Sequence, residues 1–415
     1  MNRKYNNAMK RRNIVSAWLK PVWIALLCTF GIACRQVEPV QEKTLQILNS
    51  EMPVSVSLDD MVDSIAFIPL ETSDNCLLGY IMSAKRDGNH CFVQDERGLF
   101  VFDSKGKFLN EIGHKGDGPE EYHAMDCYGI DRLHKLVWIF CAIERKVIRY
   151  NYDGSYHSTL LLDEKDANVS SFRVGDDGTL FAYFPLPNKA MEIDKACCVF
   201  RQEDERLVSE KLLDAPALSS GEAYYPYLYY PMATCWGKDY FIAALSNKLY
   251  VFKEGKMVTE GVVNLPDILP DESFLAGHAG LEFMELRNVM MKEGQSLGLT
   301  AVKSGGDYLL LSVNNLETLV WDGDTGILVS DVFQPDLNSY SNLGLARGMS
   351  DEDLDCLDAE FLYSNREQIA RNGNSELASL VDSLQEDDNP VLCQYYLKKN
   401  LITHLKRLYL DKDGR

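Results

Sequence analysis

The sequence predicts an all-β protein, a six-bladed β-propeller in which strands from the two ends of the chain share one blade. Three observations predict this fold. Apolar and polar residues alternate with a period of two over most of residues 55–400. Similar units recur at intervals of about 40 to 60 residues. A lone strand pattern stands at each end of the series, at residues 62–72 and 390–399.

Each complete unit contains short apolar runs that are separated by turns rich in Gly, Asp and Asn. In the first unit the turns are DERG and DSKG, and the second unit has NYDG where the first has DSKG. A single four-stranded sheet cannot cover both of its faces, so radially packed sheets cover one another. The five units lie within residues 91–113, 135–162, 177–213, 238–265 and 306–333.

The sixth blade is predicted to be composite, with the strand at 62–72 placed outside the strand at 390–399 in one sheet. Such sharing removes the exposed edges that an open ring would have. The segment LGLARGMSDEDLDCLDAEF (343–361) would supply the inner strands. Short helical insertions are expected at about 265–293 and 359–385, where the apolar spacing is helical. The propeller is therefore expected to span residues 55–400.

The N-terminus has the features of a signal peptide. Residues 1–20 carry six basic and no acidic residues, and the 13 apolar residues PVWIALLCTFGIA follow. This run is too short to span a bilayer as a permanent helix. The order of basic, apolar and small residues predicts a signal peptide at residues 1–33.

A cysteine directly after the predicted cleavage point is similar to the lipobox of bacterial lipoproteins, in which that thiol receives the lipid anchor. Here the cysteine is Cys34, and Gly31 replaces the usual Leu. An uncleaved anchor and an ordinary signal peptide are the alternatives. Residues 34–54 are expected to hold the lipidated cysteine and a polar tether, and residues 401–415 a C-terminal tail.

Composition excludes some partners. The formal net charge of −20 argues against nucleic acid and against an anionic lipid surface, because both require a basic face. The chain has eleven cysteines, most of them inside apolar runs, and no C-x-x-C pair with zinc spacing. We therefore expect free, buried thiols rather than a disulfide framework.

Three segments carry a resemblance to a known family. FIPLETSDNCLLG (67–79), VFDSKGKFLNEIGHKGDGPEEY (101–122) and EDDNPVLCQYYLKK (386–399) resemble landmarks of six-bladed β-propeller lipoproteins of anaerobic gut bacteria. That family implies a fold similar to NHL-repeat propellers, and its function is largely unassigned. Members commonly have Gly after the Pro of the second segment, where this chain has Glu120.

The stretch EIGHKGDGPEEYHAM (111–125) supplies the first candidate site. It connects the last strand of one blade to the first strand of the next, and we expect it to cross the top face toward the central channel. A phosphate loop is excluded, since Pro and two Glu follow the last Gly and no helix pattern begins there. The candidate ligand-binding residues of this crossing and of the preceding one are Glu71, Lys115, Asp117, Glu121 and Tyr122.

Three interpretations of these side chains remain open. Glu121 and Tyr122 could anchor the loop by hydrogen bonds to nearby backbone. The same groups could contact a ligand. A divalent cation such as calcium could also be held by carboxylates and carbonyls at the channel mouth.

A tyrosine-rich segment supplies the second candidate site. GEAYYPYLYYPM (221–232) contains five tyrosines, of which Tyr225, Tyr227 and Tyr229 would share one face of a strand. Aromatic faces with a polar tip suit stacking on sugars or peptides. The alternative is an inner strand whose aromatic residues pack between blades.

These features favour a non-enzymatic binding module of the cell envelope, exported and held on the periplasmic or outer-membrane side by a lipid anchor. Its top face would bind a glycan, a peptide or a protein partner. The alternatives are a metal-assisted lactonase or lyase-type propeller enzyme and an envelope scaffold. No catalytic residue and no resident metal or cofactor is assigned, because no G-x-S-x-G elbow is present and the histidines are scattered.

Overall fold

A computed structural model gives the structure of the protein. It describes residues 43–49, 52–167, 169–184, 195–214, 228, 230–264, 269–278, 281, 283–314, 317–330, 349–372 and 375–412. Residues 43–415 form one compact unit. The predicted signal peptide and Cys34 therefore lie outside the described residues. No described helix is long and apolar enough to cross a membrane.

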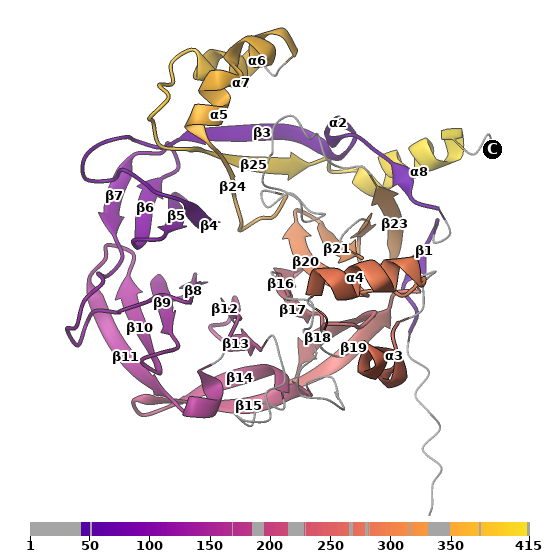
Figure 1. The fold of residues 1–415 in the computed structure, drawn as a ribbon, viewed down its shortest axis with the longest axis horizontal. Helices are drawn as coiled ribbons and strands as arrows, with labels where there is room; N and C mark the ends of the chain where they lie inside the picture. The colour runs from indigo at the N-terminus through magenta and orange to yellow at the C-terminus, as the bar shows by residue number, and fades with distance from the viewer. Residues whose placement is uncertain are drawn as a thin grey trace, which may run out of the picture. The chain divides into compact units, whose positions relative to one another are not determined.

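The unit is mostly β, and its sheets are arranged around a centre as in a propeller (Figure 1). The described strands form five hydrogen-bonded sheets, so the predicted count of six blades is not confirmed. The first sheet has four antiparallel strands in chain order. Its strands are β4 (Ile81–Asp87), β5 (His90–Asp95), β6 (Leu99–Asp103) and β7 (Phe108–Glu111).

The glycine-closed turns predicted from the sequence link consecutive strands. Gly106, between β6 and β7, has φ +84°. A side chain at this position would also collide with the backbone of Pro69. Only glycine fits such a left-handed position against a neighbouring backbone.

The next sheet has eight strands and consists of two four-stranded halves. The halves meet where the outer strands pair in parallel over two residue pairs, Leu161–Arg206 and Leu162–Leu207. The first half contains β8 (Cys127–Asp131), β9 (Leu136–Cys141), β10 (Lys146–Asn151) and β11 (Tyr156–Leu162). The second contains β12 (Ser171–Val174), β13 (Leu180–Tyr183), β14 (Lys195–Glu203) and β15 (Arg206–Asp214), and the 3-10 helix η1 (Glu164–Asp166) precedes it.

Two further sheets continue the series. One contains β16 (Met232–Cys235), β17 (Lys238–Phe241), β18 (Lys248–Lys253) and β19 (Lys256–Val262). The other contains β20 (Leu299–Gly305), β21 (Tyr308–Val313), β22 (Glu317–Trp321) and β23 (Thr325–Ser330). Two short strands, β1 (Gln46–Ile47) and β2 (Val54–Ser55), pair in parallel with β23.

The pairing of β1 and β2 differs from the predicted tether over residues 34–54. From Lys43 onward this segment belongs to the folded unit. Its buried Asn49 accepts a hydrogen bond from the Leu328 N–H (2.8 Å) and donates one to the Leu328 carbonyl (2.7 Å). The amide side chain therefore replaces a strand partner between β1 and β2.

The two ends of the chain share the last sheet, in the order β24 (Asp355–Leu357), β25 (Val391–Leu397) and β3 (Val62–Pro69). The register runs antiparallel from Val391–Pro69 to Leu397–Val62. The predicted pairing of 62–72 with 390–399, with the N-terminal strand outside, is therefore present. Of the predicted inner segment, residues 343–348 lie outside the described part of the chain.

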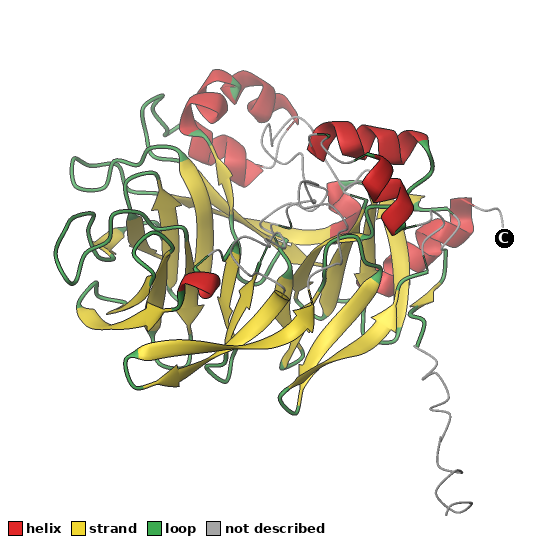
Figure 2. Cartoon of the chain, turned by 60° about the horizontal axis from the view of Figure 1, so that its bottom comes forward, coloured by secondary structure: helices red, strands yellow, loops and turns green. Residues whose placement is uncertain are grey.

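Helices occupy both predicted insertions, and most of them gather on one side of the sheets (Figure 2). The predicted tail differs, because most of it forms a helix whose Leu401 and Leu405 are fully buried. The helices are α2 (Leu58–Met61), α3 (Glu272–Gly277), α4 (Phe283–Lys292), α5 (Ala359–Ser364), α6 (Arg366–Asn372), α7 (Ser375–Val381) and α8 (Leu401–Lys412).

The cysteines of the described chain agree with the predicted free thiols. All nine are unpaired, and seven of them are buried. Burial raises the pKa of Cys91 to about 11 and that of Cys127 to about 12. These thiols are therefore uncharged at neutral pH and pack as small apolar groups.

Candidate functional site

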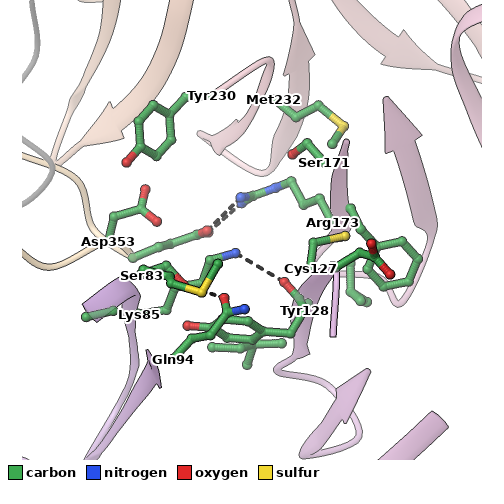
Figure 3. A pocket seen from close by; sticks show the side chains of 18 of the residues that line it. Ser83, Lys85, Gln94, Cys127, Tyr128, Ser171, Arg173, Tyr230, Met232 and Asp353 are labelled. Carbon is green, nitrogen blue, oxygen red and sulfur yellow. Dashed lines mark hydrogen bonds and ion pairs between the residues drawn. The ribbon is translucent and has the colours of Figure 1, made fainter. Parts of the chain in front are cut away.

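A cavity of about 230 Å³ lies where the first strands of the sheets converge (Figure 3). We call it the axial cavity. Its walls come mainly from β4, β8, β12, β16 and residues adjoining them, with Gln94 of β5 and with Glu352 and Asp353, which precede β24. In Figure 1 these strands are the ones nearest the centre of the ring. The site is thus built from residues far apart in the sequence.

Local structure places the segment 350–354 against β4. The Ser350 hydroxyl accepts hydrogen bonds from the backbone N–H groups of Glu352 and Asp353, both at 3.2 Å. The Glu352 carbonyl then accepts from Arg86 N–H at 2.6 Å, and Leu354 N–H donates to the Ala84 carbonyl at 2.9 Å. This backbone pairing holds the two adjacent acids at the axis.

A glycine lets β8 and β12 approach closely. A side chain at Gly129 of β8 would lie 2.9 Å from the ring of Phe172 on β12. A glycine inside a strand often marks such a close approach. Arg132, just after β8, and Arg173, on β12, can therefore both reach Glu352.

These three residues form an ion bridge across the axis. Arg132 Nη1 lies 2.7 Å from Glu352 Oε1, and Arg173 Nη1 donates to Glu352 Oε2 at 2.6 Å. Arg173 Nη2 also donates to Glu352 Oε1. The Glu352 side chain is only 17% exposed. One carboxylate thus binds two guanidinium groups, one of them in bidentate geometry.

Electrostatics keep this carboxylate ionised. Burial alone would raise the pKa of Glu352, but the charges and hydrogen bonds of Arg173 and Arg132 outweigh burial and hold its pKa far below the ordinary value. Arg173 also donates to the Thr234 hydroxyl at 2.8 Å and 3.1 Å. The bridge is therefore fixed in both position and charge.

The ion bridge is a wall shared by two cavities. A second cavity, of about 460 Å³, is lined by Asp87, Asp176 and Gln394 among others. Arg132 and Glu352 line both this cavity and the axial one. The bridge therefore closes the axial cavity at one end.

The interior of the axial cavity carries an ammonium group and a carboxylate. The backbones of Lys85 and Asp353 face each other in an isolated antiparallel bridge. Lys85 Nζ donates to the Tyr128 carbonyl at 3.4 Å and lies 4.9 Å from the centre of the Tyr128 ring. Figure 3 shows the Asp353 carboxylate on the side where Tyr230 lies. Among the described residues, no group donates a hydrogen bond to this carboxylate.

Asp126 and several neutral groups complete the lining. Ser83 donates to Gln94 Oε1 at 3.0 Å, and Ser171 adds a second hydroxyl. Met82 and Met232 provide apolar surface. Hydrogen-bond donors, acceptors and apolar surface thus surround one small volume, the usual composition of a ligand site.

The predicted crossing loop lies elsewhere. Tyr122 is fully buried and packs in a core cluster with Ile112 and Tyr150. Its hydroxyl donates to the Ile112 carbonyl over a long 3.5 Å. Glu121 Oε2 accepts from Gly118 N–H at 2.8 Å. These contacts hold the loop to itself and to the two sheets that it connects.

The other predicted residues also contact nearby backbone or loop groups. Lys115 Nζ donates to the Glu96 carbonyl at 2.6 Å, and Asp117 pairs with His123 in the same loop. Glu71 Oε2 accepts from Phe108 N–H at 3.1 Å.

The structure therefore brings Lys115, Asp117, Glu121 and Tyr122 into one loop and leaves Glu71 in another. None of the five lines the axial cavity. Tyr225, Tyr227 and Tyr229 lie outside the described residues. A ligand role for these eight side chains stays a prediction.

The residues that line the axial cavity were not predicted from the sequence, although a signal was available. Lys85 and Arg173 are each charged residues inside otherwise strand-like runs, MSAKRD and SFRV. A charge on the innermost strand of a blade faces the axis or a neighbouring blade, and either place is desolvated. Glu352 and Asp353 belong to the acidic run DEDLD, in the segment 343–361 that was expected only to supply inner strands.

Metal ligands are also absent from the described part of the chain, where no group of three or more His, Cys, Asp or Glu side chains is placed to hold an ion. The calcium alternative at the crossing loop stays a prediction.

A solved structure resembles this chain in fold. A Bacteroides fragilis NCTC 9343 protein described as exported has a TM-score of 0.62 and 17% identity, over 84% of this chain and 100% of that one. A member of the duf4221 family from Bacteroides vulgatus ATCC 8482 has a TM-score of 0.44 and 10% identity, over 65% and 86%. A streptogramin B lyase has a TM-score of 0.37 and 13% identity, over 66% and 74%. The last two scores do not establish a shared fold.

No curated protein matches the chain. A family model described as Domain of unknown function (DUF4934) matches residues 43–396, nearly the whole folded unit. The chain therefore belongs to the DUF4934 family.

Proposed function

We propose that this protein is a binding module of the bacterial cell envelope that holds one sugar unit of a glycan in the axial cavity. The observation that carries the proposal is the pair formed by Lys85 and Asp353, whose backbones face each other and which both line a small cavity without an ion pair between them. Each sugar hydroxyl both donates and accepts hydrogen bonds. A sugar can therefore satisfy an ammonium group and a carboxylate at adjacent positions.

Size and lining support the same ligand class. Sites for drug-sized molecules usually measure about 300–1,000 Å³, so a cavity of about 230 Å³ suits one unit of a larger ligand. The Tyr230 ring and the Met232 side chain offer apolar surface to the C–H faces of a sugar. A peptide or protein ligand would contact the cavity with one side chain.

We count the eight-stranded sheet as two blades. Its halves β8–β11 and β12–β15 repeat the four-strand order of the neighbouring sheets, and only two residue pairs join them. This count gives six blades around the axial cavity.

We further place the protein outside the cytoplasm, anchored through Cys34. The apolar run at 21–33 with its basic flank supports export. Replacing Cys34 by Ser should move the protein from the membrane fraction to the soluble fraction and abolish labelling by a radioactive fatty acid. Retention of Cys34→Ser in membranes would exclude this anchor.

A glycan array followed by calorimetry tests the binding function. The purified protein should bind a subset of glycans, and the sugar unit that they share should compete. Asp353→Asn keeps the shape of the side chain and removes its charge, and it should weaken binding by about tenfold or more. The matched control is Asp307→Asn, at an exposed turn outside the cavity.

Three results would count against the proposal. These are an array without binders, equal affinity of Asp353→Asn and the unmodified protein, or binding only to peptides. Turnover of a bound sugar derivative would favour the enzyme alternative.

A further inference from the structure

We infer that the cleft between the two halves of the eight-stranded sheet is a second binding site, for a small carboxylate with an apolar body. We call it the lateral cleft. Its volume is about 490 Å³, and it shares no lining residue with the axial cavity. The inference is therefore independent of the proposed glycan site.

The architecture of the sheet leaves this cleft open. The outer strands β11 and β15 bond to each other only at Leu161–Leu162 and Arg206–Leu207. At the rim, Gly178 has φ +83°, and a side chain there would lie 3.3 Å from the His134 ring. Glycine at position 178 therefore leaves space at the rim beside His134.

The wall of the cleft is apolar. Leu136 and Trp138 come from one half of the sheet, and Leu180, Phe200 and Leu207 come from the other. Trp138 is 6% exposed, and its indole N–H has no hydrogen-bond partner among the described residues. A buried donor without a partner is unfavourable, and a nearby acceptor on a ligand would relieve it.

Arg149 supplies a cation that is not held in an ion pair, although Asp131 lines the same cleft. Its Nε donates to Ser158 at 2.7 Å, its Nη1 donates to Gln202 at 3.2 Å, and its guanidinium lies 5.0 Å from the centre of the Trp138 ring. No carboxylate of the described chain forms an ion pair with it. The nearby Asp131 instead accepts two hydrogen bonds from His134, both at 2.9 Å.

A comparison of Arg149 with Arg132 and Arg173 supports the inference that Arg149 binds a ligand carboxylate. Glu352 raises the pKa values of Arg132 and Arg173 despite burial. At Arg149, burial lowers the pKa, and the charge of Asp131 only partly offsets it. A partly buried guanidinium is favoured in its charged form by an adjacent anion. A ligand carboxylate would therefore complete the cleft, and its apolar body would contact Trp138 and its neighbours.

Two probes of the same shape test the inference. Phenylacetate carries the carboxylate, and phenylacetamide is neutral. Titration calorimetry and saturation-transfer NMR on the purified protein should show binding of phenylacetate, with phenylacetamide about tenfold weaker or worse. Arg149→Met keeps an unbranched side chain over Trp138 and should lose at least about tenfold in affinity. Arg149→Lys should recover part of the loss.

Controls separate binding from folding and from the axial site. Arg201→Met removes an exposed arginine of β14 that lies outside the cleft, and it should bind phenylacetate normally. Asp353→Asn should also leave this binding unchanged. The inference is overturned by undetectable phenylacetate binding, by equal binding of phenylacetamide, or by unchanged affinity in a folded Arg149→Met.

Discussion

At the scale of single residues, burial and charge compensation decide which groups matter. Glu352, Arg132 and Arg173 are charged and largely withdrawn from water, yet each has a partner at hydrogen-bonding distance. Arg149 is partly buried and has hydrogen-bond partners, but it forms no ion pair with a carboxylate of the described chain. The first arrangement is complete in itself, whereas the second leaves a place for an anion.

Breaking the ion bridge should strongly lower the free energy of unfolding. Glu352→Gln leaves two guanidinium groups without their counter-charge, and we expect the free energy of unfolding to fall by about 3–5 kcal/mol. Urea denaturation measures this loss. Glu203→Gln, at an exposed position at the end of β14, is the control and should change little. A loss below about 1 kcal/mol in Glu352→Gln would contradict the bridge.

The same carboxylate predicts a pH dependence. Its pKa in the folded protein lies below the ordinary value of 4.5. The stabilisation is therefore complete above the unfolded pKa and is lost as pH falls through the folded pKa. Asp87 and Asp95, whose pKa values are also lowered, act in the same direction. The raised pKa of Asp239 acts oppositely.

Denaturation at a series of pH values measures this effect. The free energy of unfolding should fall as pH decreases below about 5. The difference between the unmodified protein and Glu352→Gln should be constant at neutral pH and shrink in acid. A difference that grows on acidification would refute the assigned sign.

Some of these roles of single residues could be predicted from the sequence. Free cysteines follow from their apolar neighbours and from the lack of a C-x-x-C pair with zinc spacing. The role of Tyr122 did not follow, because a period-two pattern cannot tell a side chain that faces a ligand from one packed between sheets. Lys85 and Glu352 were not predicted as site residues, because their site exists only after strands that are distant in the sequence converge.

At the scale of elements, the turns were the most predictable feature. Gly106 and Gly154 close equivalent turns and have φ +84° and +83°, and a turn glycine is visible in any sequence. The short strands β1 and β2 were not predictable, because a strand of two residues is too short to show an alternation of apolar and polar residues. Their docking depends on the side chain of Asn49.

Replacing Asn49 by Ala should weaken this docking. The substitution leaves the buried N–H and carbonyl of Leu328 without partners, and we expect a loss of about 2 kcal/mol in the free energy of unfolding. Hydrogen exchange at the Leu328 amide should accelerate in Asn49→Ala. Asn49→Asp retains the acceptor and should protect that amide better. Unchanged exchange in Asn49→Ala would show that β1 and β2 dock by other means.

At the scale of the whole molecule, the sheet β24–β25–β3 joins the two chain ends. Facing residues of antiparallel strands have Cβ atoms about 4.5–5.5 Å apart, near the span of a disulfide. In this register Phe67 faces the native Cys393. Mild oxidation of Phe67→Cys should therefore cross-link the two strands, as peptide mapping would show.

The matched control is Ser64→Cys, which faces Tyr396 in the same sheet. It should remain free under the same oxidation. Absence of the cross-link in Phe67→Cys, or its equal formation in Ser64→Cys, would contradict the closing sheet.

The repeat units and the pairing of the chain ends were predictable at this scale, because both rest on strand patterns. The side chains that line the axial cavity were not predictable.

Hydrogen–deuterium exchange with and without the sugar found on the array tests the central claim most directly. Binding in the axial cavity predicts slower exchange in β4 and in residues 350–354, with no change in residues 113–122. Slower exchange confined to residues 113–122, or no change at the axis at saturating sugar, would contradict it.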